Sequence, residues 1–515
     1  MKDNMKSCQH TLSEDTVYKE VVVIGNGPSG MVTSFMLAGN VPYLKDIPED
    51  LPIDEMLRAR LSNLPQGQSL YETDLLALAE GLEGRSQNPI PLLMDNLMRP
   101  CADLGIQADP LIEWKYDVEK EIDHIVLGRG PPGGAWHTFP PTVRTLSPAA
   151  WLSLPPHSPN DASRLSARAV AHYCRRYVPA CGLQKYFRCG VIVTSVSRAP
   201  HAQSGVRCPD QRCPLNARFY VSGYDKSDGR SFRYACRRVV VACGGGDRPN
   251  TLAPPVAAHA VHSLAAVERA VHALSAQGGS PAVLIVGSGV SAADALRLCR
   301  RGPSPSPSPL LHVHHAHRTP AGALAALHPA AYPDYHQIYK MMCDGPSGNH
   351  PNYTSYPEHL ILEVTPTNKR TDRLSDEDDL AIRPKRVKLL NLVTNQTTEI
   401  EVSLIAVFIG SKPDLFFLQT NYLECIAQME CPNCITKRND DKQCFLKNRW
   451  HYLKSILGQS IQICKSRYLS SELNGNDTEC VIPDCKKRDI ISYDSKKCSC
   501  DNLNPFSSGI GFGLD

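Results

Sequence analysis

Two stretches of the chain share one pattern of hydrophobic and polar positions. Each has a run of apolar β-forming residues, then a glycine-rich turn, then apolar positions at helical spacing. They read VVVIGNGPSGMVTSFML at residues 21–37 and AVLIVGSGVSAADALRL at residues 282–298. Uninterrupted apolar runs are typical of parallel strands that are buried on both faces. The pattern therefore predicts two Rossmann-type units, each made of a strand, a turn and a helix.

The glycine turns predict dinucleotide binding. In a G-x-G-x-x-G/A turn the first glycine makes the tight turn, and the second lets the backbone approach a pyrophosphate. The third small residue allows close helix packing, and the helix N-terminus stabilises the phosphate charge. One such turn is weak evidence, but two indicate a flavin at the first and a nicotinamide at the second. The candidate binding residues are Gly25, Asn26, Gly27, Pro28, Ser29 and Gly30, and Gly287, Ser288, Gly289, Ser291 and Ala292.

The first unit does not continue as a minimal Rossmann fold would. Residues 40–124 hold prolines and polar helical stretches, which indicates an insertion, and the second buried strand is predicted only at His124–Leu127. The later elements expected from periodicity are a helical segment over 164–190, strands at 191–197, 217–223 and 231–242, and, around the second turn, strands at Leu310–His314 and Val402–Ile409.

Length and charge exclude some classes of protein. A chain of 515 residues fits two or three domains. Its net charge of +3 is too small to indicate nucleic acid or an anionic membrane as the main partner. No apolar run approaches the roughly 20 residues that span a bilayer, and the first residues lack the apolar region of a secretory signal. We expect a cytoplasmic or nucleocytoplasmic protein whose cysteines are mostly reduced.

Three further motifs lie in order along the chain: G-G-x-W, a strand exit that reads A-C-G, and a later G-x-x-P strand exit. With the two glycine turns, this order resembles that of flavin-containing monooxygenases, in which the second Rossmann domain is inserted into the first. The resemblance implies that the G-G-x-W loop lies along the flavin, with core packing as the alternative role of its tryptophan. The residues concerned are Gly133, Gly134, Trp136, His137, Ala242, Gly244 and Gly410.

The segment HVHHAHRTP after the second unit's next strand bears on the choice of cofactor. An acid at this place would hold a ribose 2′-hydroxyl, whereas basic residues accept a 2′-phosphate. The segment carries histidines and Arg318 but no acid, so it favours NADPH, with His315 and Arg318 as candidate contacts. The histidines also allow a metal site, which the lack of a nearby carboxylate or cysteine disfavours.

Longer blocks resemble one family more specifically. GLEGRSQNP at 81–89, LGRGPPGGAWH at 127–137, YPDYHQIYKMMC at 332–343 and YTSYPEH at 353–359 are similar to the oxidative-stress-induced growth inhibitor (OSGIN) family. The similarity extends over roughly residues 20–418. It implies an FAD- and NADPH-dependent monooxygenase-like flavoprotein that restrains cell growth and division under oxidative stress. The implied location is the cytoplasm, with the nucleus and the division midbody as further locations.

These observations predict an α/β protein with two Rossmann-like dinucleotide-binding domains and an irregular C-terminal tail. The expected parts are a disordered segment 1–19, an FAD domain 20–260 with the insertion at about 40–124, an NADPH domain 261–400, a return strand to the FAD domain at 401–420, and a cysteine-rich tail 421–515.

The chain departs from the family pattern in ways that favour a second hypothesis. No acid ends the flavin unit's second strand, since Leu127 leads into Gly128-Arg129-Gly130; Glu49 and Asp50 have nearly the right spacing but lie in a proline-rich segment. The monooxygenase fingerprint F-x-G-x-x-x-H-S survives only at its end, since Val256 and Ala258 replace its Phe and Gly while His262 and Ser263 remain. No terminal Gly-Asp flavin contact is found. The alternative is therefore a catalytically impaired scaffold that acts through protein partners. No catalytic side chain is assigned, and the substrate is left open.

The tail leaves a further alternative open. Cys431 and Cys434 are spaced like a pair of zinc ligands, and four later cysteines add candidates, but the C-x-x-C…C-x-x-C spacing of a zinc ribbon is not met. We expect an irregular tail rather than a zinc site.

Overall fold

The computed structural model describes residues 15–84, 88–104, 106, 108–159, 163–199, 216–277, 281–301, 311–318, 322–367 and 382–418. The tail 421–515 and its candidate zinc ligands, including Cys431 and Cys434, lie outside the described residues, as does the segment 1–14.

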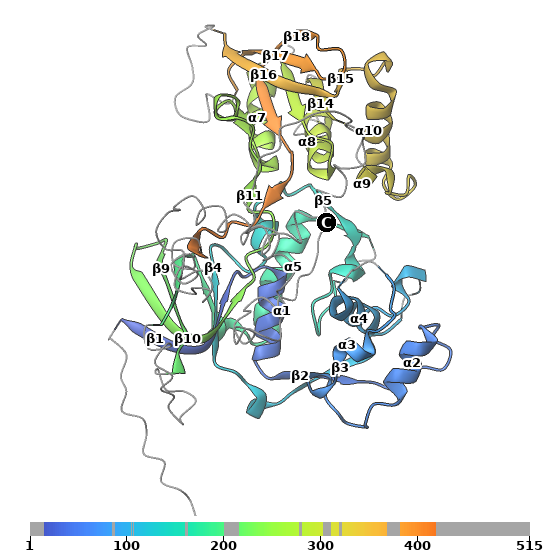
Figure 1. Cartoon of the computed structure of the whole chain (residues 1–515), viewed down its shortest axis with the longest axis vertical. Coiled ribbons are helices and arrows are strands. Elements are labelled where there is room, and N and C mark those ends of the chain that lie inside the picture. Colours follow the sequence, from blue (N-terminus) through green and yellow to red (C-terminus); the bar gives the residue numbers. More distant parts are fainter. Residues whose placement is uncertain are drawn as a thin grey trace, which may run out of the picture. The chain divides into compact units, whose positions relative to one another are not determined.

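The first sheet has the strand order β7-β4-β1-β10-β9-β8 (Figure 1). Its central pairs β1–β4, β1–β10 and β4–β7 are parallel, whereas β10–β9 and β9–β8 are antiparallel. The strand predicted at His124–Leu127, after the insertion, is present as β4 and lies directly beside β1. The strands are β1 (Thr16–Ile24), β4 (His124–Gly128), β7 (Phe187–Cys189), β8 (Val191–Arg198), β9 (Phe219–Asp225) and β10 (Ser231–Val241).

β1 begins earlier than the sequence pattern indicated. Thr16, Val17 and Tyr18 continue the parallel pairing with β10 at Arg233–Ala235. The expectation of a disordered segment up to residue 19 is therefore wrong for these positions, because a neighbouring strand satisfies their backbone groups.

Two helices cover one face of this sheet. Figure 1 shows α1 (Pro28–Leu37) and α5 (Ala167–Ala180) side by side. Met31 and Phe35 of α1 share a buried apolar cluster with Val170 and Tyr177 of α5. On the sheet side, the fully buried His124 of β4 lies 2.8 Å from the Ser34 hydroxyl of α1, so the polar groups at this junction are paired.

The insertion folds around an apolar cluster of its own. Its strands β2 (Asn40–Leu44) and β3 (Ile112–Tyr116) pair with each other and are not part of the first sheet. Leu57, Leu61, Leu93 and Leu97 lie in the cluster. Polar caps fix where the helices begin, since Asp54, Asp74 and Asn88 accept backbone N–H groups of the first turns. The helices are α2 (Glu55–Ser62), α3 (Leu75–Leu78), α4 (Pro89–Met98) and the 3₁₀ turns η1 (Leu70–Glu72), η2 (Ala102–Leu104) and η3 (Val118–Lys120).

Short elements connect the insertion to the rest of the first unit. A hairpin of β5 (Arg144–Pro148) and β6 (Arg164–Ser166) precedes α5. The helical segment expected over 164–190 is therefore wrong at both ends, where residues 164–166 and 187–189 form strands that pair with β5 and β4. The 3₁₀ turns here are η4 (Gly134–His137), η5 (Ala149–Leu152) and η6 (Gln184–Tyr186).

The second sheet has the order β12-β19-β13-β14-β15, and all of its pairs are parallel. Its two faces have different coverings, and alternate residues of β13 divide between them: Val283 and Ile285 pack with the helices, and Leu284 packs with a three-stranded sheet. The strands are β12 (Ala260–Val261), β13 (Ala282–Val286), β14 (His312–His317), β15 (Tyr353–Pro357) and β19 (Leu404–Val407); the main helices are α7 (Leu264–Gln277), α8 (Val290–Arg301) and α10 (Pro333–Asp344).

The remaining elements are the antiparallel sheet β16 (His359–Pro366), β17 (Lys385–Asn391) and β18 (Thr397–Val402), with α6 (Pro254–Ala257), α9 (Gly322–Ala325), η9 (Gly345–Ser347) and the paired short strands β11 (Arg248–Pro249) and β20 (Ser411–Lys412). Among the helices of the described residues, none combines the length and the hydrophobicity that a bilayer crossing requires.

One predicted boundary is wrong. The strand expected within 401–420 to return to the first domain is β19, and it pairs with β13 and β12 inside the second sheet. The return begins after Gly410, where β20 pairs with β11. An apolar run reveals a buried strand but not the sheet that contains it.

A buried polar network joins two helices of the second unit. The Tyr335 hydroxyl of α10 donates to Asp294 Oδ1 of α8 at 2.7 Å, and Arg297 Nη1 lies 3.0 Å from the same oxygen. Tyr335 is fully buried, and burial raises the pKa of the Asp294 carboxyl above its ordinary value. The hydroxyl and the guanidinium together compensate for the loss of water around this group.

Replacing Tyr335 with phenylalanine is therefore expected to lower the free energy of unfolding by about 1–3 kcal/mol, because a buried carboxylate loses a hydrogen-bond donor. Tyr339→Phe on the same helix, at a half-buried position, is the control and is expected to change it by less than about 0.5 kcal/mol. Urea unfolding followed by circular dichroism measures both. Equal effects of the two substitutions would contradict the assigned role of the network.

Candidate dinucleotide-binding sites

The first glycine turn, between β1 and α1, is closed by close backbone contacts. Gly25 has φ +111°, and a Cβ added to it would lie 2.2 Å from the carbonyl oxygen of Ala242. A Cβ on Gly30 would lie 2.0 Å from the carbonyl oxygen of Gly25. Only glycine fits at these two positions, so the turn is pressed against the end of β10.

Gly27 differs from its neighbours in the turn. No described atom lies within 4 Å of the place where its Cβ would be, and its φ of −70° is open to any residue. α1 begins at the next residue, Pro28, whose missing N–H costs nothing at the first helical position. The open space therefore lies at a helix N-terminus, where a phosphate is favoured.

The second turn repeats this arrangement. Gly287 has φ +134°, and its added Cβ would lie 2.0 Å from the carbonyl oxygen of Phe408 and 3.5 Å from Ala292 Cβ. Around Gly289 no described atom lies within 4 Å of an added Cβ. The N-terminus of α8 follows, with Ser288 half-buried and Ser291 exposed. Both turns are thus closed at the first glycine and open at the second, which fits the approach of a pyrophosphate.

The G-G-x-W loop lies against the first turn. The backbone N–H of Gly133 donates to the Asn26 carbonyl oxygen at 2.9 Å, and an added Cβ on Gly134 would lie 3.2 Å from Gly27 Cα. The two sequence motifs are therefore brought together.

The two aromatic residues of that loop have contacts within the protein. His137 Nε2 lies 2.8 Å from the Pro132 carbonyl oxygen and so holds the loop. Trp136 is half-buried, packs on the cluster between α1 and α5, and lies edge-to-face with Phe139. These contacts support the core-packing role of Trp136.

The two strand exits lie on the connections between the units. Ala242 donates its N–H to the Ile24 carbonyl oxygen at 2.7 Å, and Gly244 after it is exposed, with φ +80°. The carbonyl of Gly410, φ +91°, accepts the N–H of Asn250 at 2.9 Å. Ala242 thus packs against the first turn from the end of β10, whereas Gly410 lies on the return connection.

Asn26 occupies the space at the end of β4, where the family pattern has an acid. A Cβ on Gly128 would lie 2.1 Å from Asn26 Nδ2, and this nitrogen donates to the Gly130 carbonyl oxygen at 2.7 Å. While Asn26 keeps this position, residue 128 has no room for a side chain. Glu49 and Asp50 do not fill the role from the first sheet, because they lie in the turn between β2 and α2 of the insertion.

His315 of β14 holds the backbone of the second turn through a hydrogen bond. Its side chain is fully buried, with Nε2 at 2.7 Å from the Gly287 carbonyl oxygen and Nδ1 at 3.0 Å from the Tyr353 hydroxyl. Burial lowers the pKa of its imidazole to about 3, so the ring is neutral. This geometry argues against His315 as a direct phosphate contact. The exposed Arg318 follows β14 at the carboxyl edge of the sheet and keeps its candidate role.

His317 of β14 is also buried, and His314 is half-buried. Burial lowers the pKa of His314 and of His317 to about 4. Within the described part of the chain, no group of three His, Cys, Asp or Glu side chains is placed to hold a metal ion.

Two features were not found by sequence reasoning. The first is an ion pair between Arg129, just after β4, and Asp414 of the return connection. The only signal for it in the sequence is the G-R-G segment at a strand end.

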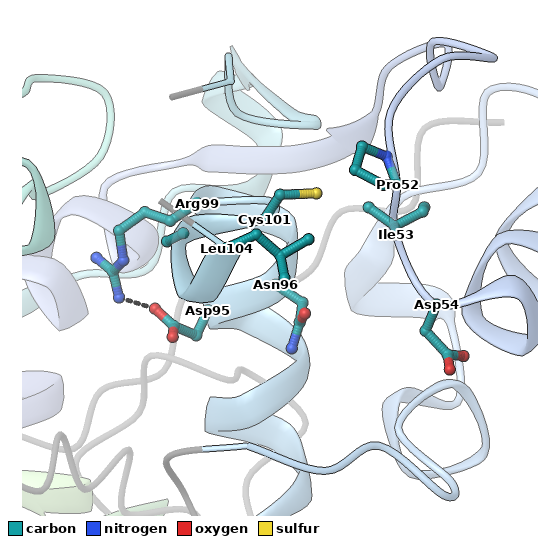
Figure 2. Close-up of a pocket in the computed structure, with 9 residues that line it drawn as sticks. Pro52, Ile53, Asp54, Asp95, Asn96, Arg99, Cys101 and Leu104 are labelled. Atoms are coloured by element: carbon teal, nitrogen blue, oxygen red, sulfur yellow. Dashed lines mark hydrogen bonds and ion pairs between the residues drawn. The ribbon is translucent and has the colours of Figure 1, made fainter. Parts of the chain in front are cut away.

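The second is a cavity of about 120 Å³ in the insertion (Figure 2), whose lining includes Asp95, Arg99 and Cys101. In Figure 2, Arg99 faces Asp95 and the Cys101 thiol points towards Pro52. All of its lining residues belong to the insertion, and none to a glycine turn.

Fold and turns together define a protein with two Rossmann units, each with an open glycine turn at its sheet edge. No model of a known protein family matches the sequence. Among characterised proteins, the chain is 36% identical to Oxidative stress-induced growth inhibitor 1 of Mus musculus over 77% of this chain and 81% of that protein. It is 33% identical to Oxidative stress-induced growth inhibitor 2 of Homo sapiens, over 79% and 82%. The chain belongs to the oxidative stress-induced growth inhibitor family, which confirms the resemblance of its sequence blocks.

Solved structures give more distant likenesses. Bacillithiol Disulfide Reductase Bdr (YpdA) from Bacillus cereus matches with a TM-score of 0.45 and 13% identity, over 78% of this chain and 81% of that chain. Ornithine Hydroxylase (PvdA) from Pseudomonas aeruginosa matches with a TM-score of 0.43 and 13% identity, over 80% and 86%.

The two glycines of the first turn predict opposite consequences of one substitution. Gly27→Ala is expected to leave the fold intact and to weaken dinucleotide binding at least tenfold, because its methyl group fills the open space. Gly25→Ala is expected to reduce soluble, folded protein, because its methyl group would overlap the Ala242 carbonyl. Thermal unfolding and flavin retention on gel filtration separate the two effects. A Gly27→Ala protein that keeps its full flavin content would show that no ligand uses this space.

The buried histidines predict a loss of stability in mild acid. Burial lowers the pKa of His124 and of His317 to about 4 and of His315 to about 3. Below about pH 6.5 these histidines bind protons in the unfolded chain but not in the native protein. Their contribution to the free energy of unfolding is therefore fully present above this pH and is lost as the pH falls towards 4. Each such histidine contributes up to about 1.4 kcal/mol per pH unit. We expect a lower urea midpoint at pH 5.5 than at pH 7.0.

The exposed His172 on α5 supplies the control. His172→Asn is expected to leave the pH dependence unchanged, and His315→Gln to make it shallower. A urea midpoint that does not move between the two pH values would refute the neutral, buried state of these rings.

Proposed function

We propose that the first turn binds FAD, that the second binds NADPH, and that the protein is an NADPH-dependent flavoprotein monooxygenase. The observation that carries this proposal is the repeated geometry of the two turns, each closed at one glycine and open at the next. A bound flavin would accept a hydride from the nicotinamide and would react with O₂. The residues of this chain hold, orient and shield the two cofactors.

At the first site, the open backbone at Gly27 and the N-terminus of α1 would receive the pyrophosphate. The loop at Gly133 and Gly134 would lie along the cofactor, since it contacts the same turn. Asn26 keeps this loop and the end of β4 in place through its bond to Gly130.

At the second site, Gly289 and the N-terminus of α8 would receive the NADPH pyrophosphate. Arg318 would accept the 2′-phosphate, because the segment after β14 supplies a cation and no acid. His315 would act indirectly by fixing the Gly287 carbonyl from the protein side.

Family membership supports the biological role that we propose. The relatives are named for growth inhibition induced by oxidative stress, and we infer the same role here, including restraint of cell division. The substrate is not specified by any described side chain. The inferred location is the cytoplasm, with the nucleus and the division midbody as further locations.

A second candidate is a catalytically impaired scaffold that regulates growth through protein partners. The observation that favours it is the closed end of β4, where Asn26 leaves no room for the acid that usually holds a ribose. The eroded fingerprint at Val256 and Ala258 supports the same alternative.

The visible spectrum of the purified full chain tests the proposal. We expect a yellow protein whose flavin absorption is bleached by NADPH without air, more slowly by NADH, and recovers when O₂ is admitted. Gly289→Ala is expected to keep the colour and lose the bleaching, whereas Gly27→Ala loses the colour. A colourless wild-type protein that gains no flavin on incubation with FAD would favour the scaffold.

A further inference from the structure

If FAD binds at the first turn, its adenosine ribose needs a hydrogen-bond acceptor that β4 does not provide. The strand ends in Gly128, and the Asn26 amide fills the space beside it. That amide nitrogen is already bonded to Gly130, and Asn26 is 4% exposed. An acceptor for the ribose hydroxyls must therefore come from another part of the chain.

Arg129 brings a carboxylate from a distant part of the sequence to this place. It follows Gly128 directly, and its Nη2 lies 3.2 Å from Oδ2 of Asp414. Its guanidinium carbon lies 5.9 Å from the ring centre of Phe416 in the same segment. Asp414 is thereby held beside the end of β4, although 285 residues separate the paired side chains.

The segment that carries Asp414 is fixed from its other side as well. β20 pairs with β11, which places Lys412 opposite Arg248, and Asn250 donates its N–H to Gly410. β11 belongs to the connection that leaves β10 beside the first turn, where a Cβ on Gly25 would lie 2.8 Å from Cys243 N. The Asp414 carboxylate thus pairs with the residue that follows β4, and the backbone just before it pairs with the connection that leaves β10.

Charge and accessibility suit a ligand contact. Asp247 and Asp414 both interact electrostatically with the Cys243 thiol, and Arg129 interacts with it in the opposite sense. Asp247 and Asp414 thus both lie within electrostatic range of the Arg129 guanidinium. The Asp414 side chain is 27% exposed, so it is ordered by its partner yet open to a ligand.

We propose that Asp414 takes the place of the missing strand-end acid and accepts hydrogen bonds from the adenosine ribose hydroxyls of FAD. Arg129 is the positioning residue, because it holds Oδ2 and directs the carboxylate to the end of β4. This proposal rests on the proposed function, namely FAD at the first turn.

The test measures binding of FAD, and of the analogue whose adenosine lacks the 2′-hydroxyl, to full-length protein freed of flavin. Wild type is expected to prefer FAD by about tenfold, since a hydrogen bond to a charged acceptor is lost with the analogue. Asp414→Asn is expected to bind FAD about tenfold more weakly and to lose most of the preference. Glu49→Gln, in the insertion, is the matched control and is expected to behave as wild type.

The outcomes separate the possible roles. If Asp414→Asn weakens both ligands equally and keeps the preference, Asp414 only positions the loop and the proposal is wrong. If Asp414→Asn binds FAD with the same affinity as wild type, the proposal fails, but the assignment of FAD to the first turn stands. If wild type binds neither ligand, the proposed function and this assignment fail together. Thermal unfolding checks that the variants fold, as expected for a partly exposed ion pair.

Discussion

The structure depends on a close contact between backbones that recurs at the first glycine of both turns. At Gly25 and at Gly287 the chain turns so near to the end of a neighbouring strand that a Cβ would overlap a carbonyl oxygen. The hydrogen bonds around the two turns correspond. Gly25 and Gly287 each donate to the strand on one side, at 2.8 and 3.0 Å, and the strand on the other side donates back at 2.7 Å in both units. Helix position, turn shape and the open second glycine all follow from this contact.

The two units stabilise their turns with different polar side chains. In the first, the side chain of Asn26 within the turn bonds outward to the loop after β4. In the second, His315 from the neighbouring strand bonds to the turn from below. Both side chains are buried and paired, as buried polar groups must be. Two unrelated side chains therefore fix the same backbone geometry.

The sequence was most informative where backbone geometry restricts residue type. The glycine turns, the strand at His124 and the insertion before it follow from spacing and apolar runs, and the structure has them where expected. Long-range pairing was not readable in this way. The apolar run at Leu404 predicts a strand but not its pairing with β13. The burial of His315 could not be predicted either, because its side chain is polar. The ion pair of Arg129 and Asp414 joins positions too far apart in sequence for any local pattern to connect them.

The insertion enters and leaves the first unit at nearly the same point. The N–H of Asp117 donates to the Gly39 carbonyl at 2.8 Å, and the N–H of Ile122 donates to the Leu37 carbonyl at 2.8 Å. For the Rossmann sheet, the whole segment between these bonds thus counts as a single surface loop, whose length matters little to the stability of its anchors. Such a module can gain, lose or exchange binding surfaces during evolution while the strand order beneath it stays the same.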